Sequence, residues 1–217
     1  MKPTIQYICS SCGAKAPQML GRCPVCGEWG TYEEEVSVST KSGKSVTSVG
    51  RASAPKRLHE IEVQTETRID MQSSELNRVL GGGLVPGSLV LLGGEPGIGK
   101  STLSLQIPLG CPSLKTLYVT GEESAKQVKM RAERLGGDGS SCLIFCETML
   151  ENILDEAQKV APDLMIVDSV QTMFSESVEA TPGSVSQIKE VAARLLRFAK
   201  ESGVPVILIG HITKEGY

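Results

Sequence analysis

The sequence predicts an α/β fold built on a mainly parallel sheet, with a small separate module in front of it. From Ser88 onward, apolar runs alternate with longer amphipathic stretches, which is the order of strands and helices in a parallel α/β sheet. A glycine-rich loop follows the first apolar run, and two matched cysteine pairs stand near the N-terminus. These observations indicate one main domain and one small module.

Length and composition agree with this organisation. A chain of 217 residues with 40% hydrophobic content can bury a core of ordinary size and carry a small module that needs outside help to fold. The formal net charge of -3 gives no global basic field, so any contact with nucleic acid must be local. Residues 1–8 lack the apolar core of a secretion signal, and no apolar run approaches the roughly 20 residues that span a bilayer. We therefore expect a cytoplasmic protein without a membrane partner, in which clustered cysteines bind metal.

The expected elements follow the alternation of apolar and amphipathic runs. Strands are expected at 88–93, 116–120, 142–146, 163–168 and 205–210, and helices at 100–107, 123–135, 149–160 and 184–201. The module at 1–32 precedes an aperiodic linker at 33–59, and the α/β domain occupies 60–217. Because the sequence stops soon after the last strand, we expect this domain to be incomplete at its C-terminus. Strand 205–210 is then expected to form an uncovered edge.

One helix is expected to end early. Pro108 and Pro112 follow the glycine-rich loop at short distance. A proline in a helix interior lacks the backbone N–H and clashes with the preceding turn, which costs about 3 kcal/mol or more. We therefore expect the helix that begins at residue 100 to end near Ile107.

The N-terminal cysteines have the spacing of a structural zinc site. Two C-x-x-C pairs are separated by ten residues, and a glycine follows each pair. Glycine can adopt positive φ, which turns backbone N–H groups toward the thiolates, and four protein ligands leave no open position on the metal. A redox pair is the alternative, but it needs a single C-x-x-C inside a thioredoxin-like fold. The predicted zinc ligands are Cys9, Cys12, Cys23 and Cys26. The remaining cysteines are expected to be buried small side chains: Cys111, Cys142 and Cys146.

Residues 94–101 match the phosphate-binding loop G-x-x-x-x-G-K-[ST] in the context of a strand before it and a helix after it. Glycines allow backbone N–H groups to approach phosphate oxygens, and the helix N-terminus adds its positive dipole end. Lys100 is expected to bind the β- and γ-phosphates of ATP and to act in catalysis, and Ser101 to supply a hydroxyl to Mg²⁺. The predicted nucleotide-binding residues are Gly94, Glu95, Pro96, Gly97, Ile98, Gly99, Lys100, Ser101 and Thr102.

A second motif places a carboxylate at the same edge of the sheet. Four apolar residues, 164–167, precede Asp168, and the carboxyl ends of parallel strands are where ligands bind in open α/β sheets. A carboxylate there can hold the water shell of Mg²⁺ opposite Ser101. In isolation, such an aspartate is as often a helix N-cap, so that role stays open.

Three further segments carry a family resemblance: LNRVLGGGLVPGS at 76–88, YVTGEES at 118–124 and GHITKEG at 210–216. With the cysteine module in front, they resemble the RadA (Sms) family of bacterial DNA-repair proteins along essentially the whole chain. The resemblance implies a RecA-like core and ATP hydrolysis coupled to processing of branched recombination intermediates. It also implies single-stranded or branched DNA as a partner, a homo-oligomeric ring in the full-length protein, and a recombinase or replicative helicase as a further partner.

The same resemblance implies catalytic residues. Glu122 matches the RecA-like glutamate that polarises the attacking water, and Glu123 is a substitute beside it. A carboxylate at the end of a strand next to the phosphate-loop strand is suited to that work, so we expect strand 116–120 to be that neighbour. The alternative is that both glutamates only favour the N-terminus of the next helix. His211 matches a γ-phosphate sensor that relays nucleotide state to a DNA-binding loop.

The sequence offers two candidate segments for the expected contact with DNA. Residues 171–183 occupy the position of a RecA-family DNA loop, yet they contain Glu176 and Glu179 and no basic residue. The basic stretch at 126–134 also contains Glu133 and is expected to be a solvated helix face. An alternative function therefore stays open. In it, the chain is a nucleotide-switched adaptor that binds ATP and recruits a helicase or recombinase through its zinc module.

The cysteine spacing predicts about one zinc ion per chain, held by four thiolates. Metal analysis of protein purified without chelator should find it. Cys23→Ser is expected to release the zinc and unfold residues 1–30, because so small a module depends on its metal. Circular dichroism should show the α/β domain still folded, since a linker separates the two. Metal-free wild-type protein would refute the zinc site.

Overall fold

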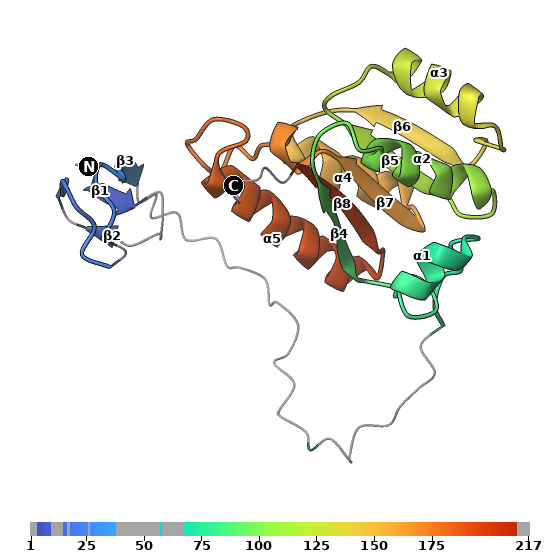
Figure 1. Cartoon of the computed structure of the whole chain (residues 1–217), viewed down its shortest axis with the longest axis horizontal. Helices are drawn as coiled ribbons and strands as arrows, with labels where there is room; N and C mark the ends of the chain where they lie inside the picture. The colour runs from blue at the N-terminus through green and yellow to red at the C-terminus, as the bar shows by residue number, and fades with distance from the viewer. Residues whose placement is uncertain are drawn as a thin grey trace. The chain divides into compact units, whose positions relative to one another are not determined.

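The computed structural model describes residues 4–9, 15–16, 18–25, 27–37, 57 and 67–211 (Figure 1). The chain divides into two compact units, Met1–Thr65 and Glu66–Tyr217.

Within the described part of the first unit, three short antiparallel strands form a sheet in the order β2-β1-β3. They are β1 (Thr4–Cys9), β2 (Lys15–Ala16) and β3 (Tyr32–Ser37). Strand β3 pairs with β1 along its whole length, from Cys9↔Tyr32 to Thr4↔Ser37. The predicted boundary at residue 32 is therefore wrong, because 33–37 belong to this sheet. Their glutamates resemble the linker in composition, and only the pairing with β1 reveals a strand.

Within residues 67–211, five parallel strands form the sheet of the second unit in the order β4-β8-β7-β5-β6. The strands are β4 (Leu89–Gly94), β5 (Thr116–Thr120), β6 (Cys142–Cys146), β7 (Leu164–Asp168) and β8 (Val206–His211). The predicted strands and the α/β class are confirmed. Their order is not what we expected, because β8 lies between β4 and β7 and is no edge. Likewise, β5 is separated from the phosphate-loop strand β4 by two strands.

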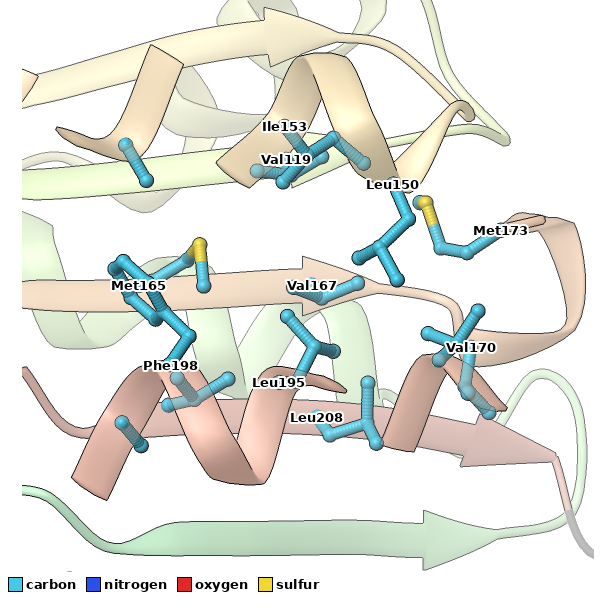
Figure 2. Close-up of a cluster of buried hydrophobic side chains, with 14 of the residues drawn as sticks. Val119, Leu150, Ile153, Met165, Val167, Val170, Met173, Leu195, Phe198 and Leu208 are labelled. Atoms are coloured by element: carbon cyan, nitrogen blue, oxygen red, sulfur yellow. The ribbon is translucent and has the colours of Figure 1, made fainter. Parts of the chain in front are cut away.

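Helices cover both faces of this sheet. One apolar core joins the sheet to α2 (Lys100–Gly110) and α3 (Ala125–Leu135), and another joins it to α4 (Leu150–Val160) and α5 (Val185–Ser202). Neighbouring residues of one strand serve opposite cores, as Tyr118 and Val119 do on β5. Figure 2 shows the second core, in which Val167, Leu195 and Leu208 meet between β7, α5 and β8. Two short elements complete the unit: α1 (Ser74–Val79) and the 3-10 turn η2 (Val170–Thr172).

Helix α2 does not end at Ile107 as expected but continues through Pro108 to Gly110. Pro108 lies in the last turn, so its missing N–H removes one hydrogen bond near the end rather than in the middle of the ladder. The carbonyl one turn before it belongs to Ser104, and the Cys111 N–H still closes the helix on the Ile107 carbonyl at 3.0 Å. The pyrrolidine ring is buried, which compensates part of the cost.

The core at α5 can be tested with two neighbouring leucines. Leu195 is fully buried, whereas Leu196 is 43% exposed. Leu195→Ala is expected to lower the free energy of unfolding by about 2–5 kcal/mol, because it leaves a cavity between α5 and the sheet. Leu196→Ala should cost well under half of that. Urea unfolding followed by circular dichroism measures both. Equal effects would contradict the assigned orientation of α5.

Candidate nucleotide-binding site

The phosphate-binding loop joins the end of β4 at Gly94 to the start of α2 at Lys100. Gly97 and Gly99 have φ of 80° and 96°, a region that favours glycine. A Cβ on Gly94 would lie 2.5 Å from Cδ1 of Ile98, so a larger residue there would displace the exposed Ile98 side chain. The predicted nucleotide-binding residues 94–102 therefore lie together in one strand-to-helix turn.

Lys100 sits inside this turn and is only 6% exposed. Its ammonium donates to the carbonyl oxygens of Gly94 at 2.8 Å and of Glu95 at 2.7 Å. The N-cap of α2 is Gly99, which has no side chain to cap the helix, so the first turn can donate N–H groups to an anion. The Lys100 ammonium and the N-terminus of α2 thus lie together at the phosphate-binding loop.

Asp168 ends β7 and is 2% exposed. Its Oδ2 accepts a hydrogen bond of 2.7 Å from the Tyr118 hydroxyl, and burial together with the Asp168 charge raises the pKa of Tyr118. The other carboxylate oxygen, Oδ1, is buried and has no hydrogen-bond partner among the described residues. Ser169, not Asp168, is the N-cap of η2. A buried carboxylate with one uncommitted oxygen fits the water shell of Mg²⁺ better than a capping role.

Glu122 lies just beyond β5, and its Oε1 has two partners. Ser169 Oγ donates to it at 2.5 Å, and Nε2 of His211 lies 3.0 Å away. Burial alone would raise the pKa of Glu122, but the hydrogen bonds from Ser169 and His211 and the positive charges of His211 and Lys100 hold it below its ordinary value. Glu122 is therefore ionised at neutral pH. Its stabilising effect is present above the ordinary carboxyl pKa and is lost as the pH falls through the folded pKa.

His211 reaches Glu122 because of its place in the sheet. It is the last residue of β8 and stands in register with Gly94, the first glycine of the phosphate-binding loop. The side-chain amide of Gln171 holds its backbone from the other side, since Nε2 donates to the His211 carbonyl at 3.1 Å and Oε1 accepts from the His211 N–H at 3.3 Å. The predicted sensor thus touches the predicted catalytic glutamate and the η2 turn.

The two adjacent glutamates have different roles. Glu123 forms a salt bridge with Arg131 of α3, and both side chains are largely buried. Its backbone N–H and that of Glu122 both donate to Thr120 Oγ1 at 3.2 Å. The cap of α3 is Ser124, which forms a reciprocal capping box with Gln127. Glu123 is therefore paired with α3, and Glu122 is the glutamate that contacts Ser169 and His211.

The structure describes two of the four predicted zinc ligands. Cys9 and Cys23 are each 1% exposed and pack in one small cluster, and Gly27 has φ of 78° with its N–H on the Cys23 carbonyl. Cys12 and Cys26 lie outside the described residues. Among the described residues, no three metal-binding side chains gather. Of the other cysteines, Cys111 is buried and Cys142 half-buried as small side chains, but the expectation is wrong for Cys146, which is exposed at the end of the edge strand β6.

The fold and the loop define a P-loop nucleotide-binding protein with a RecA-like core, and the chain belongs to the family described as AAA domain, whose profile matches residues 54–217. A profile described as a rubredoxin metal binding domain matches residues 7–34, which supports zinc at the cysteine pairs. Among solved structures, a KaiC-like protein from Pyrococcus horikoshii OT3 superposes with a TM-score of 0.56 at 22% identity, over 67% of this chain and 70% of that one. That likeness shows the fold alone.

The relatives are more specific. DNA repair protein RadA of Streptococcus pyogenes serotype M6 is 44% identical over 216 residues, which is 99% of this chain and 48% of that protein. RadA of Bacillus subtilis (strain 168) is 44% identical over 220 residues, and RadA of Listeria monocytogenes serovar 1/2a is 43% identical over 217, with the same shares. The resemblance seen in the sequence is confirmed. The chain spans about half the length of these relatives. No helix in the described ranges is long and apolar enough to cross a membrane.

Three residues that contact the site were not predicted from the sequence. Ser169 follows the predicted Mg²⁺ residue directly, so its position at a strand end was a usable signal. Tyr118 lies inside an apolar strand, where nothing in the pattern separates a core tyrosine from one that binds a carboxylate. Gln171 acts through its amide on a residue 40 positions away, which no local pattern can indicate.

The Glu122 environment gives a measurable pKa. Ser169→Ala is expected to raise the pKa of Glu122, because a hydrogen bond to the charged form is lost. Carboxyl carbon shifts of labelled protein, followed by NMR during a pH titration, report this pKa directly. Ser186→Ala removes an exposed hydroxyl from α5 and should leave it unchanged. If the pKa of Glu122 is the same in both variants, Ser169 does not stabilise the carboxylate.

Proposed function

We propose that this chain carries the ATP-binding and catalytic centre of an ATP-dependent DNA-repair protein that processes branched DNA intermediates. The observation that supports this most is the meeting of Lys100, Asp168 and Glu122 at one sheet edge, with Lys100 close enough to lower the pKa of Glu122. A phosphate-binding cation, a metal-binding carboxylate and a water-activating carboxylate are the parts that phosphoryl transfer to water needs. The relatives named DNA repair protein RadA supply the link to repair.

In the proposed reaction, Lys100 exchanges the carbonyls of Gly94 and Glu95 for phosphate oxygens, and the first turn of α2 donates N–H groups to the same phosphates. Ser101 and Asp168 would hold Mg²⁺, and the bound ion would supply positive charge beside the phosphates. Glu122 orients the attacking water and accepts its proton, for which its ionised state is required. His211, in contact with Glu122, senses the γ-phosphate from the end of β8.

Coupling to DNA is proposed through the segment after η2. Its backbone is held by Gln187 of α5, whose Nε2 donates to the carbonyls of Ser175, Val178 and Ala180 at 2.9–3.1 Å. Gln171, which lies just before this segment, donates a hydrogen bond to the His211 carbonyl. A change at His211 can therefore reach the segment through one amide contact.

The adaptor function remains the second candidate because the segment after η2 is negatively charged. Glu176 and Glu179 are exposed in the same segment, and 171–183 contain no basic residue, which is unfavourable for phosphate contact. In that function, ATP binding alone changes the affinity for a helicase or recombinase. Stimulation of hydrolysis by single-stranded DNA separates the two, since a DNA-coupled ATPase requires it and an adaptor does not.

Two substitutions should separate ATP binding from ATP hydrolysis. Lys100→Ala should weaken ATP binding, because a charge-assisted contact to phosphate is removed. Glu122→Gln should keep ATP binding and lower the hydrolysis rate by about 10²–10⁴-fold, because only the general base is lost. Fluorescent-nucleotide titration and phosphate release measure the two. Glu123→Gln is the matched control. Normal turnover in Glu122→Gln would refute the assignment.

A further inference from the structure

Tyr118 stands in the middle of β5, yet its hydroxyl contacts the predicted metal site. It is completely buried, and its phenol donates to Asp168 Oδ2 at 2.7 Å. A tyrosine kept for packing alone needs no carboxylate partner, and phenylalanine would fill the same space. The hydroxyl therefore requires its own explanation.

The sheet register directs both side chains to the same side. Tyr118 pairs with Ile166 and Thr120 with Asp168 in the parallel β5·β7 ladder. Tyr118 and Ile166 belong to the core under α2 and α3, and Asp168 lies two residues beyond Ile166 on the same face of β7. Asp168 thus points to the side of the sheet from which α2 carries Lys100 and Ser101.

Asp168 has two carboxylate oxygens, and Tyr118 occupies one of them. Oδ1, the other, is buried without a hydrogen-bond partner among the described residues. An anchored Oδ2 fixes the rotation of the carboxyl group, so Oδ1 is held in one direction before any ligand arrives. Pre-orientation of this kind by an outer hydrogen bond is how proteins increase the affinity of a metal ligand.

We propose that Tyr118 is a positioning residue for the Mg²⁺ site, which orients Asp168 through its hydroxyl. This rests on the proposed function, in which Ser101 and Asp168 hold the ion. In this role, Tyr118 acts on the metal only through Asp168.

The test is Tyr118→Phe in the whole chain, which removes only the hydroxyl. With a non-hydrolysable ATP analogue and Mn²⁺ as the probe, electron paramagnetic resonance gives the Mn²⁺ concentration that half-saturates the protein–nucleotide complex. We expect it to rise about tenfold or more, while analogue affinity in metal-free buffer stays at the wild-type value. Thr116→Val is the matched control, because it removes another fully buried hydroxyl at the far end of β5.

The outcomes are distinct. If wild-type protein shows no metal-dependent nucleotide binding, the proposed function and the positioning role both fail. If wild type shows it and Tyr118→Phe has the same Mn²⁺ requirement, only the positioning role fails, and the hydroxyl serves stability. Thermal unfolding checks that the variant folds. Should it not fold, Tyr118→Met, which also lacks the hydroxyl and has a flexible side chain, is expected to raise the Mn²⁺ requirement as well. An unchanged value overturns the proposal.

Discussion

Parallel pairing of β7 with β5 on one side and β8 on the other is the constraint on which the site depends. Because all three strands run in one direction, their carboxyl ends meet at one edge and deliver Asp168, Glu122 and His211 together. The pairing of β8 with β4 then sets His211 level with Gly94 of the phosphate-binding loop. The two apolar cores hold this arrangement in place, since β5, β7 and β8 contribute to the cores on both faces of the sheet.

Three neighbouring carboxylates at this edge have different partners, and the partners separate their proposed roles. Glu123 is neutralised by Arg131 and becomes part of the α3 attachment. Asp168 accepts from a phenol and keeps one oxygen uncommitted. Glu122 accepts from Ser169 and His211 at the open side, where Lys100 also lowers its pKa. Environment, not residue type, thus separates the proposed metal-binding and water-activating carboxylates from the one in a structural ion pair.

Two glutamine side chains connect the candidate site to the segment after η2. Gln171 fastens η2 to the end of β8, and Gln187, which is 1% exposed, fastens the following segment to α5. Each uses an uncharged group with donors and an acceptor, which can be buried at lower cost than an ion when all its hydrogen bonds are made. The route from the site toward the proposed DNA-coupling segment therefore passes through satisfied amides rather than ion pairs.

The sequence by itself determined the α/β class, the five strands, the phosphate-binding loop and the similarity to DNA repair protein RadA, because these depend on local periodicity and contiguous motifs. Strand order could not be obtained in that way, since register and neighbours arise from contacts between distant segments; β8 was expected at an edge and lies inside. The passage of α2 through Pro108 depended on where the proline falls in the last turn. Only the tertiary structure decided which glutamate faces the loop and what orients Asp168, because Arg131, Ser169 and Tyr118 act across the fold through hydrogen bonds that no sequence pattern encodes.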